Sequence, residues 1–320
     1  MATPQSPLAI PSTIDTTVLN TSLADYQKTL VDNVYNAYTI LNVLNQKCKK
    51  MINGGVSIVE NLIEARQNNG GFYSGADVLE TTQDDTLTMV EYKWQNVYEP
   101  IMITRDEERQ NSGDSHKILD LAATKMQLSE KAMGRRMEEA LSKSIAGAGN
   151  LKSLADLVGT GDFGSIAGGT DTFWQATSTT SGAFATQGLT DMQTLYYAIS
   201  SSAQVDTPDL ILTTKTVYNK YEQTRLPLER ISNGDLSFNA GAKTLTFKGE
   251  TLTYGDFIDS GVLYMLNTNY LKLYVDSATD MITSPFINPS NQTVKVAYVL
   301  WRGNLGTNNR RRMGKLTSIS

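Results

Sequence analysis

Few residues in this chain have the side chains that chemistry usually requires. Its 320 residues include one histidine, His116, and one cysteine, Cys48. A single cysteine allows neither a disulfide within the chain nor a zinc site built from several thiolates, and a single histidine excludes metal sites with two or three His ligands. A nucleophile with a histidine base would have to use His116, which lies in a polar segment where a long helix is expected to begin. We therefore expect a solvated His116, no catalytic residue and no metal site.

One glycine motif has the spacing of a cofactor loop. Gly159, Gly161 and Gly164 match the G-x-G-x-x-G pattern of dinucleotide-binding proteins. In those proteins the motif follows a strand and opens a helix, because the pyrophosphate binds at the helix N-terminus. Here a helical pattern at 151–158 precedes the motif, and a run rich in Ser, Ala and Gly follows it. The context predicts no nucleotide site, and we expect no cofactor.

The charged residues are nearly balanced. Lys and Arg total 28 and Asp and Glu total 33, a formal net charge of -5. This balance argues against a dedicated nucleic-acid binder with a broad basic face, while contact through one face stays open. Nothing places the acidic pairs at 84–85 and 138–139 across a cleft, so we interpret them as solvated charge. The basic cluster Arg310, Arg311 and Arg312 suits phosphate or the carboxylates of a neighbouring subunit, and we favour the subunit contact.

The elements that must position these residues begin with an arm. Prolines among Ser, Thr and Asn predict an extended segment over 1–20, and apolar spacing predicts helical structure over 21–44. The longest apolar runs, such as 262–266, are too short to span a bilayer. We expect a soluble chain with no membrane contact.

A long hairpin follows the arm. Alternation predicts a strand over 56–63 with apolar groups on both faces, and a return strand over 87–104. Tyr92 and Trp94 share one face of the return strand, and the polar tip between the strands carries Phe72 and Tyr73 among glycines. An isolated hairpin is marginal in water, so the tip is expected to pack on another molecule. We take these four aromatic residues as candidate inter-subunit contacts.

The rest of the sequence predicts a long helix and a compact domain. Apolar residues at three-, four- and seven-residue steps predict one helix over 114–146, about 45 Å long. Mixed helix and strand patterns with short connections predict an α+β domain over about 152–280, followed by a strand near 294–301. The fold class expected for the whole chain is α+β.

These segments in this order resemble the major capsid proteins of tailed bacteriophages, which share the HK97 capsid fold. The resemblance covers nearly the whole chain, and its order and spacing are more specific than any one motif. One departure is Arg105, where related chains often have a small residue after the return strand. The matching segments are the arm, the glycine pair 54–55, the tip 71–75, the return strand 90–94, the long helix, the strand 209–214 with 217–218, and the closing segment 300–311.

The resemblance implies a division of the chain. Residues 1–50 would be the N-terminal arm and helix, and 51–104 the extended loop that lies over an adjacent subunit. Residues 105–150 with 281–320 would form the peripheral domain with its spine helix. Residues 151–280 would form the axial domain around the centres of hexamers and pentamers. Glycines at 54–55, 70–71 and 147–149 would serve as hinges.

The resemblance also implies a function and partners. The chain would be a non-enzymatic major capsid protein that assembles with itself into the icosahedral shell around a double-stranded DNA genome, which it contacts non-specifically. A portal protein and a separate scaffolding protein would be partners, and whether a decoration protein also binds is left open. The protein would be assembled in the host cytoplasm and reside in the virion. Two alternatives remain, an encapsulin-type compartment shell and an enzyme of unknown type.

Overall fold

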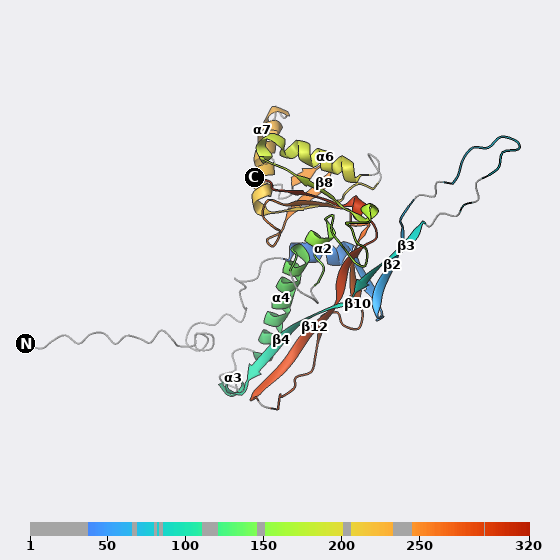
Figure 1. Ribbon diagram of the computed structural model, residues 1–320. Helices are drawn as coiled ribbons and strands as arrows, with labels where there is room; N and C mark the ends of the chain where they lie inside the picture. The colour runs from blue at the N-terminus through green and yellow to red at the C-terminus, as the bar shows by residue number, and fades with distance from the viewer. Residues whose placement is uncertain are drawn as a thin grey trace, which may run out of the picture.

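The computed structural model describes residues 38–65, 69–79, 82, 86–110, 121–145, 151–200, 206–232, 245–290 and 292–320. Within these ranges the chain forms two sheets with covering helices and a ribbon that projects from the body (Figure 1). Some sequence-based expectations lie outside the described residues: the arm at 1–20, most of the helix at 21–44, His116, the pair 84–85 and the hinge at 147–149.

A five-stranded sheet forms the lower body in Figure 1 around one long strand. The central strand is β12 (Val294–Thr307). It pairs antiparallel with β4 (Gln95–Thr104) over its first ten residues, from Val294↔Thr104 to Gly303↔Gln95, and with β10 (Leu271–Asp276) near its end. Ala297, Val299 and Trp301 share one face of this strand and are buried, whereas Leu300 on the other face is exposed. The strands are β1 (Lys49–Ile52), β4 (Gln95–Thr104), β10 (Leu271–Asp276), β11 (Ile282–Thr283) and β12 (Val294–Thr307).

The long helix α4 (Leu121–Ser142) packs along β4, after the short helix α3 (Arg105–Gln110). Its 22 described residues correspond to about 33 Å. Met133 and Met137 of the predicted apolar stripe are buried. The helix ends at Ser142 rather than at the predicted residue 146, and the predicted start at 114 lies outside the described residues.

The helix α2 (Thr39–Lys47) crosses α4, and Glu138 of α4 binds its first turn. The Glu138 carboxylate accepts hydrogen bonds from the backbone N–H groups of Ile40 (2.9 Å) and Leu41 (2.7 Å). Glu138 is only 2% exposed, which corrects its interpretation as solvated charge. Burial raises the pKa of Glu138, while these N–H groups and the positive end of the α2 dipole favour its charged form.

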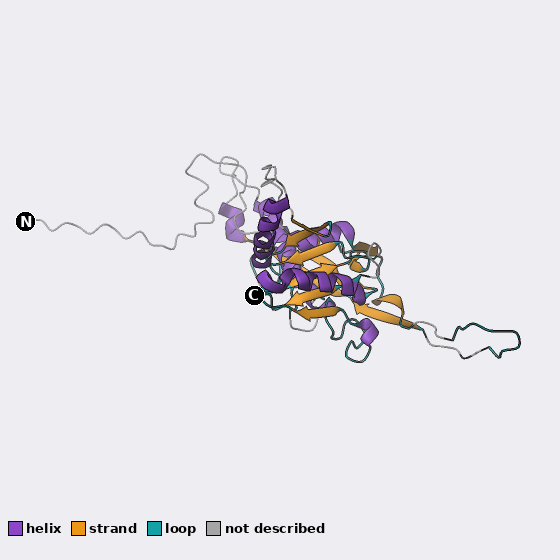
Figure 2. Ribbon diagram, turned by 90° about the horizontal axis from the view of Figure 1, so that it is seen from above, coloured by secondary structure: helices purple, strands orange, loops and turns teal. Residues whose placement is uncertain are grey.

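A six-stranded sheet forms the upper body, with helices α6 (Leu189–Ile199) and α7 (Lys215–Ser232) packed against it (Figure 2). Leu195 and Tyr221 of these helices lie in one apolar core with Ile211 and Leu263 of the sheet. In order the strands are β5 (Thr177–Thr180), β13 (Gly314–Thr317), β9 (Leu263–Leu266), β6 (Leu210–Thr213), β8 (Glu250–Tyr254) and β7 (Leu245–Phe247).

The two sheets do not follow the expected boundary at 280/281. Strand β10, expected in the axial segment 151–280, pairs with β1 and β12 of the lower sheet. Strand β13, expected in the peripheral segment 281–320, pairs with β5 and β9 of the upper sheet. Strands β10 and β13 therefore each form their backbone hydrogen bonds in the sheet on the other side of the expected boundary.

The projecting ribbon consists of β2 (Ser57–Ile63) and β3 (Leu87–Lys93), paired antiparallel from Ser57↔Lys93 to Ile63↔Leu87. The predicted return strand 87–104 is therefore two strands, because the chain changes partner at Trp94 and β4 pairs with β12. Beyond the ribbon, residues 69–79 form the loop tip, which extends far from the body in both views (Figures 1 and 2). No helix in the described ranges is long and apolar enough to cross a membrane.

Candidate inter-subunit surfaces

Arg310 lies in the interior of the protein. It belongs to the short turn Arg310–Arg312 and is 0% exposed. Its guanidinium donates hydrogen bonds to the backbone carbonyls of Asp156, Leu157, Gly159, Gly161 and Trp174 at 2.8–3.2 Å. Burial lowers the pKa of Arg310 to about 10, which leaves the side chain charged at neutral pH. The expected subunit contact is wrong for Arg310, because its donors are used inside the chain.

The G-x-G-x-x-G segment has a structural role that involves this arginine. Gly159 and Gly161 each supply a carbonyl to Arg310. Gly164 has a φ of +70°, and a Cβ there would lie 2.4 Å from a methyl group of Val90. Gly164 therefore lets this loop approach strand β3 closely, whereas Gly159 and Gly161 contribute only backbone carbonyls to the binding of Arg310.

Tyr92 is also corrected as an inter-subunit contact. It is 1% exposed, its hydroxyl donates to the carbonyl of Thr307 at 2.5 Å, and its ring packs edge-on against Phe163. Burial raises the pKa of Tyr92. Trp94 is half-buried at the junction of β3 and β4, with the Arg302 guanidinium 5.0 Å from its ring. These residues hold the base of the ribbon, and only part of Trp94 reaches the surface.

The outer face of the ribbon is an apolar surface that the contact prediction missed. The inner-face residues are buried in the core, whereas Ile63 is 77% and Leu87 71% exposed, and the two are cross-strand partners. The sequence signal was the presence of apolar residues on both faces of the predicted strand. The apolar residues of the outer face are Val59, Ile63, Leu87 and Met89, and they share this face with Ser57, Asn61, Glu91 and Lys93.

The loop tip continues this apolar surface. Phe72 and Tyr73 are 109% and 68% exposed, and Val78 and Leu79 are exposed as well. The structure therefore places both predicted tip aromatics in solvent. Since isolated proteins rarely expose so many large apolar groups on one projecting element, the ribbon and tip have the character of a contact surface.

A second apolar surface lies on the five-stranded sheet. A cavity of about 510 Å³ is lined by residues of β4, β12 and the 279 turn, with Tyr98 and Tyr298 in edge-to-face contact. Tyr98 is 62% and Met102 54% exposed. A chain that exposes two such surfaces can pair one with the other on the next copy, which gives a head-to-tail contact.

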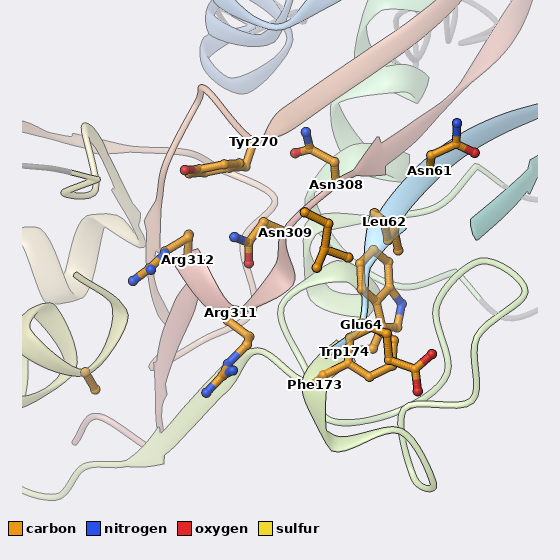
Figure 3. Close-up of a pocket in the computed structure, with 12 residues that line it drawn as sticks. Asn61, Leu62, Glu64, Phe173, Trp174, Tyr270, Asn308, Asn309, Arg311 and Arg312 are labelled. Atoms are coloured by element: carbon orange, nitrogen blue, oxygen red, sulfur yellow. The ribbon is translucent and has the colours of Figure 1, made fainter. Parts of the chain in front are cut away.

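Arg311 and Arg312 line a polar cleft where the ribbon meets the body (Figure 3). The cleft has a volume of about 520 Å³. Arg311 is exposed, and Arg312 donates one hydrogen bond to the carbonyl of Ile199 at 3.2 Å. The cluster of three arginines thus divides, with Arg310 inside the core and the other two facing this cleft.

Glu60 fixes the ribbon to the body. Its carboxylate accepts hydrogen bonds from Tyr274 (2.7 Å), Lys50 (3.0 Å) and Lys272 (3.0 Å), which lie on β10 and β1. Burial alone would raise the pKa of Glu60, but these three donors outweigh it and lower the pKa to about 2. The cluster therefore holds the angle at which the ribbon leaves the body.

Because the pKa of Glu60 is lowered from 4.5 to about 2, its contribution to stability is present above pH 4.5 and lost as the pH falls toward 2. We expect Glu60→Gln to lower the free energy of unfolding by about 1–3 kcal/mol at pH 7, and by much less at pH 2.5. Chemical denaturation of both proteins at each pH measures this difference. Glu64→Gln, at an exposed carboxylate on the same ribbon, is the control; an equal cost of Glu60→Gln at both pH values would contradict the role of the cluster.

The described part of the chain has few other groups that could bind a metal ion or act as a nucleophile. No group of three or more His, Cys, Asp and Glu residues that could hold a metal ion occurs among the described residues. Cys48 is buried, and burial raises the pKa of its thiol to about 12, so it is a poor nucleophile.

Comparison with known proteins gives a consistent result at the level of structure. No protein-family model and no curated protein matches the sequence. The Cyanophage A-1(L) capsid asymmetric unit matches with a TM-score of 0.66 at 13% identity, over 92% of this chain and 96% of that chain. The capsid of a native GTA particle matches with a TM-score of 0.65 at 11% identity, over 93% and 96% of the two chains.

An encapsulin has the same fold. The holo-SrpI encapsulin from Synechococcus elongatus PCC 7942 matches with a TM-score of 0.59 at 12% identity, over 94% of each chain. These likenesses confirm the predicted α+β class and show that the chain has the HK97-like capsid fold along nearly its whole length.

Proposed function

We propose that this protein is the major capsid protein of a tailed phage, which assembles as hexamers and pentamers into an icosahedral shell around double-stranded DNA. The observation that carries the proposal is the superposition of nearly the whole chain on subunits of phage capsids. The exposed apolar ribbon and the exposed apolar sheet face support it, because both suit burial between copies. The protein acts in the virion by holding its neighbours rather than by catalysis.

The parts of the fold correspond to proposed roles in the shell. The ribbon with its loop lies over an adjacent subunit. Helix α4 with the five-stranded sheet forms the peripheral domain, and the six-stranded sheet with α6 and α7 forms the axial domain. Modest contacts repeated over many copies make the shell durable, and a net charge of -5 limits attraction to the packaged DNA. Assembly takes place in the host cytoplasm with a separate scaffolding protein and a portal protein, and the presence of a decoration protein is left open.

An encapsulin-type shell is the second candidate, because the encapsulin match covers 94% of both chains. The two candidates differ in what the shell encloses. Nuclease-resistant DNA inside purified particles supports the phage capsid, whereas an enclosed enzyme supports the compartment.

Electron microscopy tests the proposal. We expect closed icosahedral particles when the chain is expressed with its scaffolding partner, because the scaffold selects one shell curvature, and irregular assemblies when it is expressed alone. Uniform closed shells from the chain alone would contradict the separate scaffold. A monomeric chain in both preparations, or open sheets and tubes only, would contradict the capsid assignment.

A further inference from the structure

The cleft lined by Arg311 and Arg312 lies beside the place where the loop leaves the ribbon. One wall carries Phe173 and Trp174 next to Leu62 of β2, and the opposite side carries Tyr270 with the two arginines (Figure 3). Asparagine side chains at 61, 308 and 309 also line the cleft, together with Ile63, Glu64 and Ala198. The cleft therefore combines aromatic surface, amide groups and two guanidinium groups.

Two polar atoms at this cleft lack hydrogen-bond partners. Four buried side-chain polar atoms among the described residues have none, and two of them, Nε of Arg312 and Oδ1 of Asn308, belong to cleft residues. Arg311 has no ion-pair partner in the described part of the chain. Because the Nε atom of Arg312 and the Oδ1 atom of Asn308 are buried within the subunit, it is the exposed guanidinium group of Arg311 that an incoming acidic group can reach.

We propose that this cleft receives the loop tip of a second copy of the chain. The inference rests on the proposed function and names the receiving site within it. The tip presents Phe72 and Tyr73, which are exposed and aromatic, together with the Asp77 carboxylate. Aromatic rings suit the Phe173 wall and the faces of guanidinium groups, and a carboxylate suits Arg311.

Shape and charge favour a second copy over the tip of the same chain. The tip points away from the body that contains its own cleft (Figure 1). Asp77 accepts a hydrogen bond from the backbone N–H of Ser74 at 2.8 Å, which fixes the carboxylate on the tip. Glu64 lines the cleft on the side away from Arg312 (Figure 3), so an incoming carboxylate is directed toward the arginines. Tip and cleft are different surfaces, so a contact between them runs head to tail, which is the type of contact that rings such as the proposed hexamers and pentamers require.

Engineered disulfides test the contact in the full chain. In shells formed with scaffold, the double variant Ser74→Cys with Asn309→Cys keeps both Tyr73 and Arg311, and it is expected to give a ladder of covalent multimers on non-reducing gels after mild oxidation. Each single variant is expected to stay monomeric on those gels. The native Cys48 does not interfere, because it is 5% exposed and its thiol pKa is about 12.

A mixture of the two single variants identifies the partners, since only contact between copies can link them, and covalent dimers are expected. A fast-migrating monomer band from the double variant would instead mean that each tip folds onto its own cleft, and would overturn the inference. Absence of any new band, in this pair and in the pair Phe72→Cys with Asn309→Cys, would overturn it as well.

Charge variants give an independent readout. Arg311→Glu is expected to lose most shell yield while the subunit stays folded, and Arg311→Lys to keep most of it. Normal shell yield of Arg311→Glu would overturn the tip contact while leaving the capsid function intact, whereas failure of the wild type to form shells would contradict the capsid function itself.

Discussion

Arg310→Met is expected to lower the free energy of unfolding of the subunit by about 3–5 kcal/mol, or to prevent folding. Methionine fills similar volume but supplies none of the donors that bind five backbone carbonyls between Asp156 and Trp174. Those carbonyls belong to the 156–174 segment. The loss of the hydrogen bonds to them therefore also frees the loop that packs on β3 through Gly164. Chemical denaturation of the unassembled subunit measures the effect.

Arg311→Met is the matched control, because the neighbouring side chain is exposed. We expect its cost to stay within about 0.5 kcal/mol. Arg310→Lys should fall between the two, since an ammonium group keeps the charge but has fewer donors and no planar fork. Equal unfolding free energies for Arg310→Met and Arg311→Met would show that the carbonyl cluster contributes little.

The contrast between these adjacent arginines shows where sequence patterns stop being informative. A run of three arginines predicts a solvated or contact surface for all three. Which one is buried depends on carbonyls about 150 residues earlier in the chain, and their convergence is a product of the tertiary fold. The burial of Glu138 was not predicted for the same reason, because its hydrogen-bond partners are backbone N–H groups of α2, far away in the sequence.

Periodic patterns, by contrast, located most strands and helices. The alternation at 56–63 and the stripe through Met133 and Met137 each report local burial, and the structure confirms both. Which strands pair with each other depends on distant parts of the chain. The sequence therefore did not predict that the pairing partner of the return strand changes at Trp94 from β2 to β12. The sequence did not reveal the exchange of β10 and β13 between sheets either, because strand pairing leaves no periodic signal.

Ile63→Asp is expected to abolish closed shells while leaving the subunit folded. Ile63 is 77% exposed on the outer face of the ribbon, so the unassembled chain should lose no more than about 0.5 kcal/mol of stability. In the proposed shell this face is covered by an adjacent subunit, and burying an unpaired carboxylate costs several kcal/mol per contact. Because every subunit repeats the contact, the cost recurs around the shell and outweighs the modest gain of each interface.

Sedimentation and electron microscopy measure shell formation, and denaturation of the unassembled subunit measures its folding. Ile63→Val is the matched control, because it keeps a β-branched apolar side chain at the same position and should form normal shells. The direct cross-strand partner of position 63 is Leu87, so an Asp there has no cation opposite it. If Ile63→Asp forms shells with the heat resistance of the wild type, the outer face of the ribbon is not buried in the assembly. Because Ile63 also lines the cleft of Arg311 and Arg312, that result would count against the tip contact as well.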